Sequence, residues 1–420
     1  MKDRILQAVD SPSELEALYR SNPNEFGRAF VDAFAASPDS VSLRVWHERL
    51  FFEQGAATPA SPAKLSGRDI WLAAALSLIA GTLAKLPILI PALDGEKFCA
   101  RNLGGILAGA LIVYFCIQRK CRQGTVLAVG SLWIGVLAYL NFLPGASNSA
   151  TVILACLHAP FFFWSLVGVV FLGGAWRNMA GRMDFLRYNG ELLIYTTIVL
   201  LGGMVLTGVT LALFHLIDVD ITEWYMGNVV VYGAIASPIV ATLLIERVVC
   251  GRFKIAPLLA KVFTPLFLVT VTAYLIVMIL KHKSPFTDRE FLIAFNGLLL
   301  VVLGLCIFSV SERAADTPPG AVDLMNIGLV AITLIIDIVA LAAILFRMSS
   351  EGLTPNRLAV LGANVLAFCH LAGILYRYVR FMRSARGFEA LDRWIVWYIP
   401  LYTAWSLVVV LGFPLTFHFR

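Results

Sequence analysis

Charged residues are scarce in this sequence. Asp, Glu, Lys and Arg make up 14% of its 420 residues, whereas hydrophobic residues make up 59%. Soluble globular proteins carry about 25% charged and about 45–50% apolar residues. Apolar windows of about 20 residues, the length that crosses ~30 Å of hydrocarbon as a helix, follow one another after Arg68. The composition therefore excludes an ordinary soluble protein and predicts an integral membrane protein.

Strand-like alternation of polar and apolar residues is missing from these windows. Membrane strands alternate in this way when they close into a barrel, and an open sheet would leave backbone groups unpaired in lipid. We therefore predict an all-α integral membrane protein with eleven transmembrane helices. Their expected ranges are 69–92, 103–118, 125–143, 151–175, 191–216, 228–248, 263–280, 290–310, 325–347, 358–378 and 394–415.

Metal-binding and catalytic patterns are also lacking. The seven cysteines form no CxxC pair, which is typical of free thiols. The six histidines are scattered along the chain. The sequence predicts neither a metal site nor a cofactor. HExxH and GxSxG patterns are absent, so a lipid-modifying enzyme is the weakest functional hypothesis.

The N-terminal region differs from the rest of the chain. Residues 1–53 are polar and amphipathic, and Phe26, Phe30 and Phe34 recur every four residues, which predicts short helices. Residues 54–67 are rich in Pro, Ala and Ser and are interpreted as a linker to the polytopic membrane domain, residues 68–420. We expect the N-terminal region to be cytoplasmic and to offer a surface for a protein partner.

The positive charges indicate an orientation in the membrane. The net charge of +6 comes from Lys and Arg spread over short loops, which disfavours a nucleic-acid partner. Loops on the side of the N-terminus carry about twice as many Lys and Arg as the opposite loops, so we expect the N-terminus inside and the C-terminus outside. The orientation of the spans between 263 and 347 stays open, because "KHKSPFTDRE" is basic although it is predicted outside.

Several segments resemble one protein family. They include "GEKFCARNLGGILAGALIVYF", "MDFLRYNGELLIYTTIVLLGGM", "SPFTDREFLIAFN", "EGLTPNRLAVLGANVL" and "YIPLYTAWSLVVVLGFPLTF". In these segments the chain is similar to the uncharacterised bacterial multi-pass membrane proteins grouped as domain of unknown function 4153. The resemblance implies a bacterial inner-membrane location, in which the outward C-terminus expected from the loop charges would be periplasmic. It implies no activity and no catalytic residue.

Asp337 is the principal candidate for a functional residue. It lies near the middle of "LVAITLIIDIVALAAILFRMSS", where a charged carboxylate costs about 2.5–3.5 kcal/mol on insertion scales. Either it binds a proton or cation on a pathway, or it pairs once and clamps the helix bundle. Lys85 is the second deep charge. Its long stem can snorkel to the outer side, or it can pair with Asp337 if the first and ninth spans touch.

Five polar residues are weaker candidates. Glu96 and Arg101 lie near the start of the second span, where they would pair at the interface or line an outer entrance. His158 lies at an expected proline kink. Asn296 and Asn364 are typical of hydrogen bonds between membrane helices.

Basic residues lie at both ends of the tenth span. In "GLTPNR", Thr354 is expected to cap a helix, and Arg357 at the positive helix end predicts an acidic partner such as Glu351, or a lipid phosphate. At the other end an arginine recurs every three residues, which indicates a topology anchor that binds anionic lipid headgroups. These arginines are Arg377, Arg380, Arg383 and Arg386.

These features support two functions. The first is transport or permeation of a small solute or ion, with Asp337 and Lys85 as coupling charges. The alternative is a non-catalytic membrane sensor or assembly scaffold, in which Asp337 is a packing group and residues 1–53 contact a partner.

Overall fold

The computed structural model describes residues 2–37, 40–56, 65–144, 149–249, 255–280, 286, 289–313, 318–384 and 387–418. The chain forms two compact units, Met1–Leu65 and Ser66–Arg420, and each is described by itself. Every regular element within the described ranges is a helix, which confirms the all-α prediction.

The N-terminal unit has its own hydrophobic core. Its helices are α1 (Lys2–Gln7), α2 (Pro12–Ser21), α3 (Pro23–Ala36) and α4 (Val41–Ala56). The phenylalanine spacing works as predicted, because Phe26 and Phe30 are fully buried and Phe30 stacks on Phe34. Trp46 of α4 packs against Phe26 in the same core.

The membrane unit consists of long apolar helices. They are α5 (Gly67–Ala84), α7 (Gly95–Gln118), α8 (Gln123–Phe142), α9 (Ala150–Phe171), α10 (Met179–His215), α12 (Val231–Leu244), α13 (Ile255–Leu280), α14 (Arg289–Ser311), α15 (Ala321–Glu351), α16 (Pro355–Ser384) and α17 (Phe388–Leu407). Short elements extend some of them. These are α6 (Leu86–Leu89), α11 (Thr222–Tyr225), α18 (Phe413–Thr416) and the π-helical turns η1 (Met226–Val230), η2 (Ile245–Val249) and η3 (Val408–Gly412).

Within the described part of the chain, ten helical segments are long and apolar enough to cross a membrane. The remaining predicted span, 263–280, falls in α13, where the shorter apolar stretch Val262–Ile276 is found. Helix α10 begins at Met179, well before the predicted start at 191, because the Asn178 side chain accepts a hydrogen bond from the Gly181 amide and caps it. The protein is therefore an all-α polytopic membrane protein.

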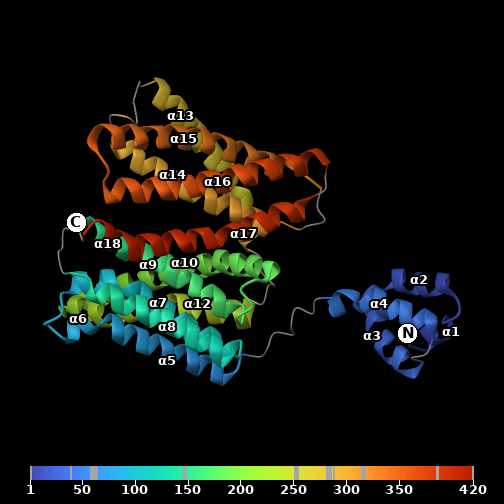
Figure 1. Cartoon of the computed structure of the whole chain (residues 1–420). Coiled ribbons are helices and arrows are strands. Elements are labelled where there is room, and N and C mark those ends of the chain that lie inside the picture. The colour runs from blue at the N-terminus through green and yellow to red at the C-terminus, as the bar shows by residue number, and fades with distance from the viewer. Residues whose placement is uncertain are drawn as a thin grey trace. The chain divides into compact units, whose positions relative to one another are not determined.

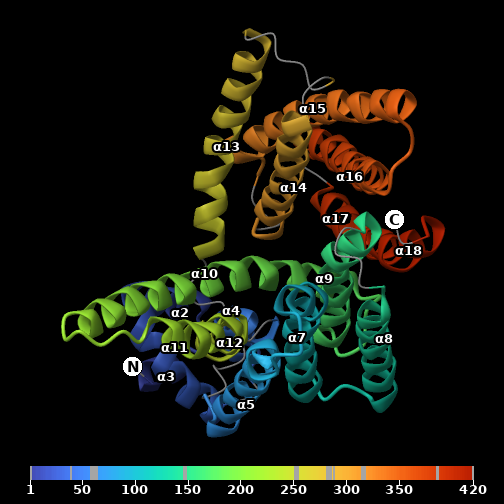
Figure 2. The same ribbon diagram turned by 90° about the vertical axis from the view of Figure 1, so that its left-hand side faces the viewer.

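The membrane unit contains two sub-bundles that pack side by side (Figure 1). The first comprises α5, α7, α8, α9, α12 and the start of α10, which share one apolar core. The second comprises α13 to α17, whose cores surround Tyr378 and Val302. Helices α9, α10 and α17 meet between the two sub-bundles. Figure 2 shows α13 beside α14 and α15 at the edge of the second sub-bundle.

Contacts between helix ends show that successive spans of the first sub-bundle alternate in direction. Arg119, after α7, donates to the carbonyl of Phe171 at the end of α9 and pairs with Glu246 of η2 at 2.6 Å. We call this the Arg119 end of the unit. The opposite end contains Lys85, after α5, which contacts Asn228 of η1, and we call it the Lys85 end.

The second sub-bundle continues the alternation. Arg187, in the first turns of α10, donates to the carbonyl of Ser311 at 2.6 Å, so α14 finishes at the Arg119 end. Asn326, near the start of α15, contacts Ser309 of α14 and Thr264 of α13. Helices α13, α14 and α15 therefore alternate regularly in direction.

Candidate functional site

Asp337 is a buried carboxylate in the middle of α15. It lies fourteen residues from Asp323 and fourteen from Glu351, near the two ends of the helix. The residue is 2% exposed, and neither carboxylate oxygen has a hydrogen-bond partner among the residues that the structure describes. An unpaired buried charge costs about 3–5 kcal/mol. The carboxyl group is therefore expected to be neutral, with a bound proton, in this conformation.

An asparagine pair lies at the depth of Asp337. The hydroxyl of Tyr378 donates to Asp323 at 3.0 Å, which fixes the register between antiparallel α15 and α16. Asp337 on α15 and Asn364 on α16 each lie fourteen residues from this hydrogen bond, about 21 Å toward the Lys85 end. The amide of Asn364 donates to the Asn296 side chain of α14 at 2.7 Å. Three candidate residues thus come from three adjacent helices to about the same depth.

Thr333 lies one turn before Asp337 on α15 and is 1% exposed. Its hydroxyl donates to the carbonyl of Leu329 at 2.8 Å, so its proton is already used within the helix. The oxygen can still accept one more hydrogen bond. Thr333 therefore adds an acceptor to the region around Asp337 but does not hold the carboxylate.

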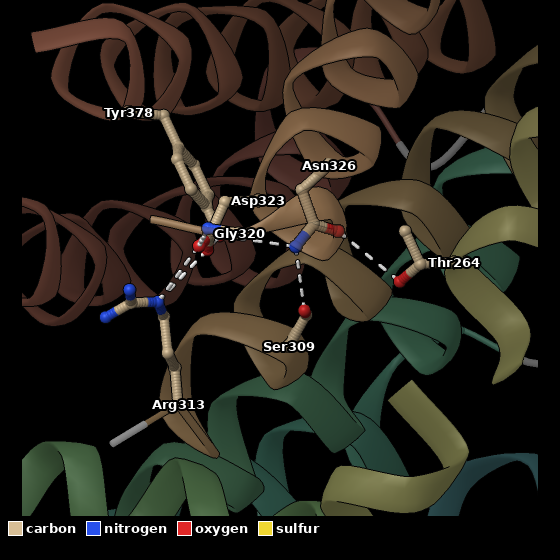
Figure 3. Close-up of polar contacts among 7 residues, drawn as sticks. All are labelled: Thr264, Ser309, Arg313, Gly320, Asp323, Asn326 and Tyr378. Atoms are coloured by element: carbon tan, nitrogen blue, oxygen red, sulfur yellow. Dashed lines mark hydrogen bonds and ion pairs between the residues drawn. The ribbon is translucent and has the colours of Figure 1, made fainter. Parts of the chain in front are cut away.

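A second polar cluster lies at the Arg119 end of α15 (Figure 3). The Arg313 guanidinium pairs with Asp323 at 3.0 Å, and their side chains are only 10% and 8% exposed. Asp323 also accepts the Gly320 amide at 2.8 Å and the Tyr378 hydroxyl. Asn326 joins this cluster by donating to Tyr378 at 3.2 Å.

Asn326 extends the cluster to two more helices (Figure 3). Its amide donates to the Ser309 hydroxyl of α14 at 2.8 Å, and its oxygen accepts from Thr264 of α13 at 3.3 Å. Arg313 and Asp323 do not stand out in the sequence, because "SERAADTPPGAVD" has the composition of an acidic loop. The sequence does contain one sign of this ion pair, because a basic and an acidic residue lie on opposite sides of a short connection.

Lys85 does not join Asp337. Its ammonium group donates to Asn228 of η1, and Thr82, in the preceding turn, hydrogen-bonds Tyr232 at 2.9 Å. Helix α5 packs on α12 and α7, whereas α15 packs on α13, α14 and α16. The hypothesis of a Lys85–Asp337 pair is therefore wrong, because the first and ninth predicted spans belong to different sub-bundles.

Glu96 and Arg101 do not pair either. Arg101 donates to the carbonyls of Asn141 and Pro144, each at 3.2 Å, while Glu96 is exposed in the first turn of α7. Residues five apart on a helix point about 140° away from each other, which explains the missing contact. Arg101 instead ties the start of α7 to the end of α8.

His158 makes a local contact. Its Nδ1 lies 2.9 Å from the carbonyl of Leu154, one turn earlier in α9. Helix α15, which carries Asp337, packs on α13, α14 and α16 rather than on α9, so the structure does not bring His158 to Asp337.

The "GLTPNR" hairpin forms as the sequence predicts. Gly352 adopts a φ of +88°, a conformation that glycine tolerates best, and ends α15. The Thr354 hydroxyl accepts the amide of Arg357 at 3.3 Å, so Thr354 caps α16. Arg357 contacts Glu351, the expected acidic partner, and donates to the carbonyl of Gly352.

The predicted arginine series divides into different environments. Arg377 is half-buried, with its guanidinium 4.1 Å from the Trp394 ring centroid and a hydrogen bond to Gly373. It is thus a packing residue in this structure. Arg380 and Arg383 are exposed near the end of α16, and Arg386 lies outside the described residues.

One histidine and one nearby carboxylate are not among the predicted site residues. His215 ends α10 and Asp220 follows five residues later. Here Asp220 accepts the amide of Thr222 at 2.9 Å, and this bond, with a weaker effect of His215, lowers the pKa of Asp220 below its ordinary value. Asp220 therefore organises the turn before α11.

Comparison with known proteins gives no relative: no family model, no curated protein and no solved structure matches the chain. Within the described residues, no group of three or more His, Cys, Asp or Glu side chains is arranged to hold a metal ion. The site is therefore defined by its own geometry, with Asp337 at its centre.

Proposed function

We propose that this protein is a permease for a small solute or ion and that Asp337 is its working charge. The observation that carries the proposal is the burial of both Asp337 oxygens without a hydrogen-bond partner among the described residues, in the middle of a membrane helix. Ionisable groups at such depths are costly and are typical of ion and proton pathways.

The burial of Asp337 also favours transport over the clamp hypothesis. A clamp needs a partner on a neighbouring helix, as Asp323 has in Arg313 and Tyr378. Asp337 has no such partner in the described part of the chain, so it contributes no bond that offsets its burial. A costly group without a structural benefit is better explained by function.

The location follows from the sequence. We place the protein in a bacterial inner membrane, as its resemblance to domain of unknown function 4153 implies. The Arg119 end faces the cytoplasm in this proposal, because the more basic loops lie there. Arg380 and Arg383, exposed at that end, then contact anionic lipid headgroups.

The test is proton flux through purified protein in liposomes that contain a pH-sensitive dye, driven by a potassium diffusion potential. We expect Asp337→Asn to reduce the flux to that of protein-free liposomes. Asp184→Asn, which changes an exposed carboxylate in α10, is the matched control and should keep the wild-type flux. A proton flux that is unchanged in Asp337→Asn would contradict the proposed role of Asp337. A wild-type flux no greater than that of empty liposomes would contradict proton permeation, the form of the proposal that this assay tests.

A membrane sensor or scaffold is the second candidate, and one observation favours it. The N-terminal unit is compact and has a separate aromatic core, which a partner-binding module needs. Deletion of residues 1–65 distinguishes the two functions. A permease should keep its flux in liposomes, whereas a sensor should lose its cellular activity while the membrane unit stays folded.

A further inference from the structure

One face of α15 carries a line of buried polar side chains. Asp323, Asn326, Thr333 and Asp337 follow each other at steps of three, seven and four residues, which places them on one side of a helix. They are 5%, 1%, 1% and 2% exposed, respectively. The line therefore connects the Arg119 end of the unit to the middle of the membrane along one helix.

The surroundings of Asp337 suit a proton better than a metal cation. Metal cations of the hard class take six or more oxygen ligands, and transporters often supply them from unwound helices. Helix α15 is continuous from Ala321 to Glu351, so its carbonyls near Asp337 are used within the helix. Asn364 and Asn296 bond to each other. A carboxylate needs only one proton to become neutral.

The Arg119 end of the polar face is closed in this structure. Arg313 pairs with Asp323 and lies against two rings, with its guanidinium carbon 4.6 Å from the Phe381 centroid and 4.8 Å from the Phe388 centroid. Tyr378 bonds the same carboxylate and is 1% exposed. These groups cover the first polar residue of the face.

An apolar stretch of nearly two turns separates the closed end from the deep site. Leu329 and Val330 lie between Asn326 and Thr333 and are fully buried. A proton cannot cross this stretch through side-chain hydrogen bonds alone, so water has to enter when the Arg313–Asp323 contact opens. The closed structure is thus one of two states that a pathway of this kind requires.

We infer that Asp337 takes up a proton, and that this proton exchanges with the Arg119 end along the polar face of α15. Arg313, Asp323 and Tyr378 form the gate that closes the route. This inference rests on the proposed function and adds to it the chemical class of the ion, the side of entry and the residues that control entry.

Cys306 is a native reporter for the route. It lies on α14, is fully buried, and belongs to the same core as Tyr378 and Val330. In a chain that keeps only this cysteine, we expect an impermeant thiol reagent to react slowly in the wild-type background. Arg313→Gln and Asp323→Asn should each raise the rate about tenfold from the Arg119 face, which corresponds to about 1.4 kcal/mol of lost stabilisation of the closed state.

Sided membrane vesicles and two controls make the result specific. A chain that keeps only Cys99, which is exposed at the Lys85 end, reports the opposite face. Arg313→Lys retains the charge and should stay nearly as closed as the wild type. Thermal unfolding of each variant in detergent shows whether the substitution lowers the stability of the whole membrane unit. In that case labelling would rise from both faces.

The outcomes separate the gate from the proposed function. Faster labelling of Cys306 from the Arg119 face alone supports the gate, together with faster hydrogen–deuterium exchange of the Asp337 carboxyl band, which the Asp337→Asn variant identifies in infrared spectra. Unchanged labelling, or faster labelling from the Lys85 face, overturns the gate. If Asp337→Asn abolishes proton flux but Cys306 stays unreactive in both gate variants, the inference fails and the permease proposal stands.

Discussion

Asp337 and Asn364 lie at about the same depth on antiparallel helices α15 and α16. Each is fourteen residues from one member of the hydrogen-bonded pair Asp323 and Tyr378. Asn364 has a partner in Asn296, whereas Asp337 has none in the described part of the chain. Two buried polar groups at one depth thus have opposite energetic roles, and this difference leads to opposite predictions for their replacement.

Replacing Asp337 by leucine should stabilise the membrane unit. Leucine has the same branching as aspartate, and it removes a buried polar group without leaving a partner unpaired. We expect a gain of about 1–3 kcal/mol in unfolding free energy, the desolvation cost of an unsatisfied group. Thermal unfolding in detergent measures it. A loss of stability of similar size would mean that Asp337 is the interhelical clamp after all, and flux should fall to the protein-free rate in either case.

Replacing Asn364 by leucine should have the opposite effect. It leaves the Asn296 side-chain oxygen without its donor, so we expect a loss of about 1 kcal/mol, within the range measured for hydrogen bonds between membrane helices. The double variant Asn296→Leu and Asn364→Leu removes both groups and should regain most of the loss. If the two single effects simply add in the double variant, the hydrogen bond does not stabilise the protein.

Composition and spacing were enough to predict the membrane helices and to select Asp337. Apolar length is a local property, and so is the position of a charged residue within an apolar stretch. The "GLTPNR" hairpin was predictable for the same reason, since Gly352, Thr354 and Arg357 act within one turn.

Neighbour relations were not predictable in the same way. The pairing of Asn296 with Asn364 depends on α14 and α16 packing together, and nothing in either helix specifies the other. Arg313 and Asp323 were overlooked because their charges lie beside a loop, although the chain folds back to bury them. The start of α10 was not predictable, because Arg182 and Arg187 lower the local hydropathy, although backbone carbonyls of neighbouring helices accept hydrogen bonds from both side chains.

Lys85 should be dispensable for proton flux. Its partner is Asn228 of η1, in the first sub-bundle, and it does not contact the helices around Asp337. We expect Lys85→Met, which keeps most of the apolar stem, to retain flux within about twofold of the wild type, since the loss of one partly exposed hydrogen bond costs about 0.5–1.5 kcal/mol and acts on stability. The liposome assay used for Asp337→Asn measures this. A flux as low as that of Asp337→Asn would place Lys85 on the pathway.

The N-terminal unit should lose an electrostatic contribution to its stability in acid. Hydrogen bonds from Arg20 and then Arg49 lower the pKa of Glu16 below its ordinary value of 4.5. Because the folded-state pKa is the lower one, the contribution is fully present above the ordinary pKa and is lost as the pH falls through the folded value. Glu16→Gln should therefore lower the melting temperature of residues 1–65 at pH 7 but leave it unchanged at a pH below both values. Circular dichroism measures both melts. Glu14→Gln, on the same helix, is the matched control, and an equal effect of Glu16→Gln at both pH values would show that its ion pairs contribute nothing.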